Sequence, residues 1–185
     1  MGEQHKKHSR REHLNDFHLN VAGEYVYDGA LYACQSDDTK QRRSKRAVWG
    51  MAAILTVAVI AGGCIPAPGM QNCFYVLLPY LGEFLGAASV IWALAKLGMD
   101  WSAVREYNYK KSVAVLPVRT AVTAVFSLLG IVCELIFFFV NDHAGQTFFA
   151  LLYVLLKLTA LLSALVLRAE IMQAEWDKLP KKDNS

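Results

Sequence analysis

The stretch from Ala47 to Gly82 reads AVWGMAAILTVAVIAGGCIPAPGMQNCFYVLLPYLG and contains no aspartate, glutamate, lysine or arginine. A helix that crosses a bilayer needs about 20 predominantly apolar residues. Pro66-Ala67-Pro68-Gly69 divides the stretch, because two closely spaced prolines cannot continue a helix. The pattern therefore predicts two transmembrane helices, over residues 47–66 and 74–97, joined by a tight turn.

The second half of the chain shows the same segregation of charge. Glu134 is the only charged residue between Arg119 and Asp142, and Lys157 is the only one between Thr147 and Leu167. Hydrophobic residues make up 55% of the 185 residues and charged residues only 19%, against about 25% charged in a typical soluble domain. We therefore expect two further spans, over residues 115–140 and 147–167. The predicted fold class is an all-α membrane protein, a four-helix transmembrane bundle made of two helical hairpins.

Three regions follow from these spans. Residues 1–46 form a polar tail, residues 47–168 the four-span transmembrane domain, and residues 169–185 a C-terminal segment. The fourth helix is expected to continue beyond the bilayer through Leu179, because the first helix-breaking residue in this segment is Pro180. The connection from Gly98 to Lys111 is expected to hold a short amphipathic helix of its own.

The distribution of lysine and arginine predicts the orientation. Nine of the 19 lie in the tail through Arg46, five between Lys96 and Arg119, and four from Arg168 onward. The loops at 66–73 and 141–146 contain none. Because cytoplasmic loops carry the excess of positive charge, both termini are expected on the cytoplasmic side of a cell membrane. The basic cluster before the first span could also bind anionic lipid headgroups; it comprises Lys40, Arg42, Arg43, Lys45 and Arg46.

The polar tail contains one segment with a strand pattern, EYVYDGALY at residues 24–32. Asp28-Gly29 between aromatic and β-branched residues is typical of a two-residue hairpin turn. We therefore expect a short cytoplasmic β-hairpin that pairs Tyr25–Tyr27 with Ala30–Tyr32. Such a hairpin is marginal alone in water and must pack on something. It is either a recognition element or a cap whose tyrosines rest at the headgroup level.

Three ionisable side chains lie inside the predicted spans. Helical rise places Glu83 about 14 Å and Lys157 about 15 Å from the outer ends of their spans, and Glu134 about 9 Å from its own. Charged residues at such depths face the bundle interior and pair with one another. We therefore expect a buried ionisable cluster in which Lys157 pairs with Glu83 or Glu134. It is either a proton- or cation-handling site or a structural pair that fixes helix register.

The remaining reactive residues give weaker indications. Cys64 and Cys73 flank the outer turn and could form a disulfide in an oxidising compartment. The sequence contains no Cys-x-x-Cys pair, which is the motif that would indicate redox catalysis. Ala61-Gly62-Gly63-Cys64 resembles a lipoprotein processing site, but the preceding basic region is too long for a signal peptide. The tail histidines complete no metal-ligand pattern; they are His5, His8, His13 and His18.

The sequence contains no phosphate-binding loop and no motif of a serine hydrolase or zinc protease. Its basic residues flank apolar runs and do not interleave with aromatics, which argues against nucleic-acid binding. We therefore expect a non-enzymatic protein without cofactor or metal. Two functions stay open: a structural, regulatory or complex-subunit protein with a protein partner, or a small proton- or cation-coupled transporter that works as a homo-oligomer around Glu83, Glu134 and Lys157.

Overall fold

The computed structural model describes residues 17–19, 23, 25–27, 29–35, 38–98, 100–141 and 146–179. The basic N-terminal stretch, with His5, His8 and His13, and the C-terminal residues from Pro180 lie outside this part of the chain. Within it, the elements run in the order β1 (Phe17–Leu19), β2 (Tyr25–Tyr27), β3 (Leu31–Cys34), α2 (Asp38–Cys64), α3 (Pro68–Asn72), α4 (Phe74–Leu97), β4 (Val104–Arg105), α5 (Glu106–Lys111), α6 (Leu116–Val140), α7 (Thr147–Gln173) and β5 (Trp176–Lys178).

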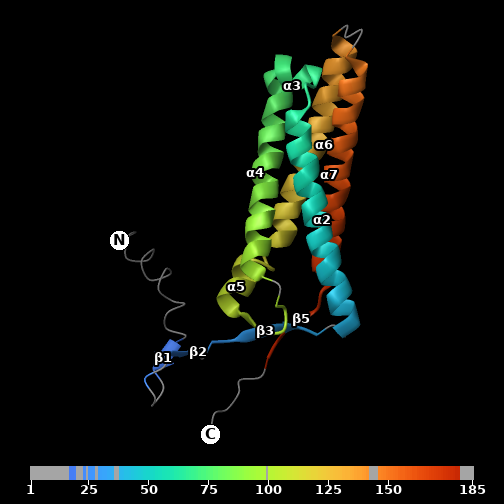
Figure 1. Ribbon diagram of the computed structural model, residues 1–185. Helices are drawn as coiled ribbons and strands as arrows, with labels where there is room; N and C mark the ends of the chain where they lie inside the picture. Colours follow the sequence, from blue (N-terminus) through green and yellow to red (C-terminus); the bar gives the residue numbers. More distant parts are fainter. Residues whose placement is uncertain are drawn as a thin grey trace, which may run out of the picture.

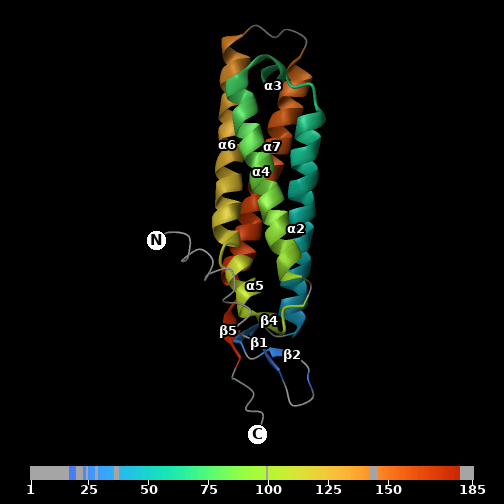
Figure 2. The same cartoon turned by 90° about the vertical axis from the view of Figure 1, so that its left-hand side faces the viewer.

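Four long helices, α2, α4, α6 and α7, run side by side as a bundle (Figures 1 and 2). Each is long and apolar enough to cross a membrane. Helix α6 packs on both α4 and α7, and α2 packs mainly on α7. Large apolar side chains such as Leu85, Trp92 and Phe139 are largely exposed on the outside of the bundle, which suits a surface surrounded by lipid. The predicted four-helix transmembrane bundle is confirmed.

The helix boundaries match the sequence prediction closely at two helices and less well at the others. Helix α4 covers Phe74–Leu97, and α6 begins at Leu116, within one residue of the predicted 115. Helix α2 begins at Asp38 and not at Ala47, because the intervening lysines and arginines are themselves good helix formers. Helix α7 ends at Gln173, so the expected helical extension to Leu179 is wrong.

The residues after α7 form a strand and not a helix, because they complete a small antiparallel sheet in the order β4-β3-β5. Leu31 lies opposite Arg105, and Cys34 lies opposite Trp176. The sheet therefore ties together the segment before α2, the connection between α4 and α6, and the C-terminal segment. Figure 1 shows it at one end of the bundle, which we call the sheet end. The opposite end carries α3 and is called the α3 end.

Aromatic side chains pack between the sheet and the bundle. The ring of Tyr32 on β3 stacks on Tyr109 of α5, with centroids 4.3 Å apart. Trp101 is buried and lies 5.6 Å from the ring of Trp176 on β5. Trp101 also belongs to a core cluster that joins these aromatics to the sheet-end turns of the long helices. The sheet is thus a packed part of the fold.

The predicted hairpin around Asp28-Gly29 is wrong in its pairing. Strand β2 (Tyr25–Tyr27) does pair antiparallel, but with β1 (Phe17–Leu19) before it in the chain. Strand β3 cannot pair with β2, because β4 and β5 occupy both of its edges. The turn of the observed hairpin includes Gly23, whose φ of 78° is a backbone conformation that glycine adopts without cost. A hairpin therefore precedes the first span, one strand earlier than the turn signal indicated.

The connection from Gly98 to Lys111 contains the expected short helix, but its first residues form a turn and a strand. Asp100 accepts hydrogen bonds from the backbone nitrogen and the hydroxyl of Ser102, at 3.1 and 2.6 Å. The hydrogen bonds from Ser102 hold the pKa of Asp100 below its usual range. They stabilise a local turn and not a helix N-terminus. The chain then extends as β4, and the helix of this connection, α5, begins only at Glu106.

Candidate functional site: the buried polar cluster

The three ionisable residues of the spans come from three different helices. Glu83 lies on α4, Glu134 on α6 and Lys157 on α7. Each is at most 1% exposed, so all three face the interior of the bundle, as their depth requires. None of them touches the lipid-facing surface. We call these three residues, with the polar groups that contact them, the buried polar cluster.

Lys157 and Glu83 form an ion pair between the lysine Nζ and the glutamate Oε2. The other carboxylate oxygen, Oε1, accepts a hydrogen bond of 2.7 Å from the hydroxyl of Ser127. The Lys157 Nζ also lies 4.6 Å from the ring centroid of Tyr80 and 5.0 Å from that of Tyr153, within cation–π range. Of the two pairings that the sequence left open, the structure contains the one with Glu83.

Small residues allow the helices to approach closely around this pair. A Cβ added to Gly86 on α4 would lie 2.6 Å from the hydroxyl oxygen of Thr123 and 3.3 Å from its Cα, so α4 and α6 are in contact at this level. A Cβ added to Gly130 on α6 would lie 3.6 Å from Cε of Lys157. The stripe of Thr123, Ser127, Gly130 and Glu134 is buried along α6. The expected small and polar interface is therefore present.

Glu134 is not part of the ion pair. Its Oε1 accepts a hydrogen bond from the backbone nitrogen of Gly69 at 3.4 Å, and its Oε2 has no hydrogen-bond partner among the described residues. Gly69 lies in α3, and a side chain there would collide with the Glu134 carboxylate. The carboxylate thus holds α3 against α6 at the α3 end. Glu134 therefore lies in the bundle interior but apart from the Glu83–Lys157 pair.

Tyr153 is a member of the cluster that the sequence reasoning missed. It is completely buried, and its hydroxyl has no hydrogen-bond partner in the described part of the chain. It precedes Lys157 by one helical turn, so both lie on the same face of α7. The four-residue spacing from Lys157 could have indicated that Tyr153 faces the bundle interior. In the sequence, however, a tyrosine inside an apolar run resembles an ordinary membrane-facing aromatic. Together, Glu134 and Tyr153 bring two unsatisfied oxygen atoms into the α3-end half of the bundle.

Both cysteines of the possible outer disulfide are free thiols in this structure. Cys64 is an exposed free thiol at the end of α2, and Cys73 is a half-buried free thiol directly before α4. The residues between them include the whole of α3. No group of three or more His, Cys, Asp or Glu residues within the described ranges is placed to hold a metal ion.

Comparison with known proteins adds no assignment: no protein family model, no curated protein and no solved structure matches this chain. The function has to be argued from the geometry alone. The cluster offers one complete ion pair, which is electrically neutral and internally hydrogen-bonded. It also offers one carboxyl group without a cation partner, which can hold a proton or a cation.

Proposed function

We propose that this protein is a non-enzymatic, multi-pass membrane protein that serves as a structural or regulatory subunit of a larger membrane assembly. The observation that supports this most is the β1–β2 hairpin. Figure 1 shows the two strands at the sheet end, to one side of the helices, and Figure 2 shows them beyond that end of the bundle. Strand β2 pairs with β1, and no described helix packs extensively on either strand.

A two-stranded hairpin is marginally stable by itself in water and needs a surface to pack on. No described helix packs extensively on this hairpin, and Tyr25 is 76% exposed. Tyrosine is among the residues that contribute most at protein–protein interfaces. A protein partner at the sheet end would supply the missing contact surface and would order the hairpin.

We propose that the protein lies in a cell membrane with its sheet end on the cytoplasmic side. The loops at the α3 end contain no lysine or arginine, whereas the three segments that meet at the sheet end contain all but one of the 19. The excess of positive charge on cytoplasmic segments supports this orientation. We therefore expect the partner to be a cytoplasmic protein or the cytoplasmic part of a membrane protein.

The Glu83–Lys157 pair supports a structural role more than a transport role. Both charges are fully buried and neutralise each other, and Ser127 satisfies the second carboxylate oxygen. A transport site needs a charge that is free to take up its ion. This pair has its counter-ion within the same chain, which is how a bundle fixes the register of its helices.

The hairpin provides the test. Gly23→Val places a β-branched residue at a φ of 78°, which such residues resist, and should unfold the hairpin. Gly50→Val is the matched control, because nothing lies within 4 Å of a Cβ at Gly50. We expect the wild type and Gly50→Val to migrate in a hetero-oligomeric complex after mild solubilisation of native membranes, and Gly23→Val to migrate alone. A wild-type chain that migrates as a monomer or pure homo-oligomer contradicts the proposal.

A second candidate function is a proton- or cation-coupled transporter formed by a homo-oligomer around Glu83, Glu134 and Lys157. The unpartnered oxygen of Glu134 and the unpartnered hydroxyl of Tyr153 favour it. The test is proton flux into proteoliposomes that contain the purified chain. Flux that is abolished by Glu134→Gln supports the transporter, whereas flux no greater than in empty liposomes rejects it.

A further inference from the structure

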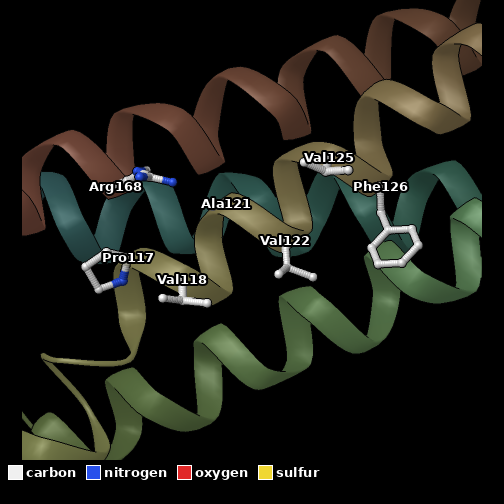
Figure 3. Close-up of a pocket in the computed structure, with 7 residues that line it drawn as sticks. All are labelled: Pro117, Val118, Ala121, Val122, Val125, Phe126 and Arg168. Atoms are coloured by element: carbon white, nitrogen blue, oxygen red, sulfur yellow. The ribbon is translucent and has the colours of Figure 1, made fainter.

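A groove runs along the outer surface of the bundle on α6 (Figure 3). Its volume is about 410 Å³. Its floor is formed by three pairs of apolar side chains, one helical turn apart, and Val118, Val122 and Val125 are exposed on the lipid-facing side. Arg168 from α7 lies beside the end at Pro117, and Phe126 lies at the other end. The groove is therefore apolar along its length, with one cationic group at one end.

The dimensions of the groove correspond to one leaflet of a bilayer. Phe126 follows Pro117 by nine residues, which is about 14 Å of helix, close to half of the roughly 30 Å hydrocarbon thickness. Arg168 follows the buried Lys157 by eleven residues, about 16 Å further along α7. If Lys157 lies near the midplane, Arg168 lies at the level of the lipid phosphates on the sheet-end side.

The guanidinium of Arg168 has no hydrogen-bond or ion-pair partner among the described residues, and the side chain is half-buried. Arg119 on α6 differs, because its Nη1 donates a hydrogen bond of 2.6 Å to the backbone oxygen of Ser89. Arginine has five donors in a planar fork that matches a phosphate group. A half-buried arginine without a partner at phosphate depth is therefore open to an anionic ligand.

We propose that this groove binds one anionic phospholipid of the sheet-end leaflet. The lipid phosphate pairs with Arg168, and one acyl chain lies along α6 from Pro117 to Phe126 and covers Val118, Val122 and Val125. The apolar contacts select a lipid over a free phosphate ion, and the single cation selects an anionic lipid over a zwitterionic one. The site is separate from the buried polar cluster and independent of the hairpin that carries the proposed function.

The test measures lipid retention by the full-length chain. The protein is purified from nanodiscs that contain equal amounts of phosphatidylglycerol and phosphatidylcholine, and bound lipid is counted by native mass spectrometry. We expect one phosphatidylglycerol per chain in the wild type and about tenfold weaker retention in Arg168→Gln, the effect of losing one charge-assisted hydrogen-bond pair. Lys178→Gln is the matched control: it removes one exposed cation on β5 at the sheet end, outside the groove and outside the basic cluster before the first span.

A second variant tests the acyl-chain part without changing charge. Val122→Trp fills the groove and should also reduce retention, whereas Val57→Trp on the exposed face of α2 should not. Inorganic phosphate and glycerol 3-phosphate should fail to displace the bound lipid. Equal losses in Arg168→Gln and Lys178→Gln, unchanged retention in Val122→Trp, or displacement by free phosphate would each overturn the proposal.

Discussion

The Glu83–Lys157 ion pair permits a quantitative test of how the bundle is held together. Lys157→Met removes the charge while keeping a side chain of similar length, so that little cavity forms. It leaves the Glu83 carboxylate unpaired in a site with no solvent exposure. Removing one partner of a buried pair typically costs about 3–5 kcal/mol, and an unpaired charge at mid-membrane costs at least about 2.5–3.5 kcal/mol on insertion scales. We therefore expect a loss of about 3 kcal/mol in unfolding free energy.

The double variant Glu83→Leu with Lys157→Met should recover most of that loss. Replacing a buried ion pair by apolar residues of similar volume is often neutral or stabilising. Ser127 stays satisfied in the double variant, because its hydroxyl also donates to the backbone oxygen of Thr123 at 3.1 Å.

The assay is reversible unfolding in mixed detergent micelles, followed by circular dichroism, for the wild type, both single variants and the double variant. Because each single variant strands a charge at a cost of about 3 kcal/mol and the double variant recovers most of that loss, the coupling energy between Glu83 and Lys157 should exceed about 3 kcal/mol. The same cycle with Glu134→Gln and Lys157→Met is the control, and it should be additive, because Glu134 contacts Gly69 and not the lysine. Additive losses for Glu83 and Lys157, or coupling only for Glu134, would refute the reasoning.

Two glycine contacts give further predictions. Gly69→Ala should destabilise the protein by about 1–3 kcal/mol, because the new methyl group meets the Glu134 carboxylate, whereas Gly62→Ala has space and should be neutral; thermal unfolding in detergent compares the two. Gly86→Ala should lower the unfolding free energy by a similar amount, because its methyl group would lie 3.3 Å from the backbone Cα of Thr123. The same thermal unfolding measurement tests this. A loss of less than about 0.5 kcal/mol would show that α4 and α6 can move apart without cost.

The sequence predicted the helical bundle well because lipid imposes a single strong requirement. Every backbone group inside the hydrocarbon must be satisfied within the helix, so apolar length alone locates the spans. The depth argument also placed Glu83 and Lys157 correctly toward the interior. It also placed Glu134 toward the interior, but it could not predict the contact of Glu134 with Gly69. That contact depends on how the short helix α3 folds back over the bundle, which no periodicity in the sequence encodes.

The polar end was predicted less well, because its strands pair across long distances in the chain. The Asp28-Gly29 signal is local, but strand β3 finds partners at Val104–Arg105 and Trp176–Lys178. Those partners are only two and three residues long and show no clear alternation. The same sheet explains why helix α7 ends at Gln173. Trp176 then lies on β5, where its ring packs against Trp101.

The most direct test of the central claim, four spans with the sheet end in the cytoplasm, is cysteine accessibility in intact cells. Single cysteines are introduced at Gln71, which is exposed at the α3 end, and at Ser102, which is exposed at the sheet end. The background chain has the exposed Cys64 and the half-buried Cys73 replaced by serine. A membrane-impermeant maleimide should label Gln71→Cys from outside, and should label Ser102→Cys only after the membrane is permeabilised. External labelling of Ser102→Cys would contradict the account.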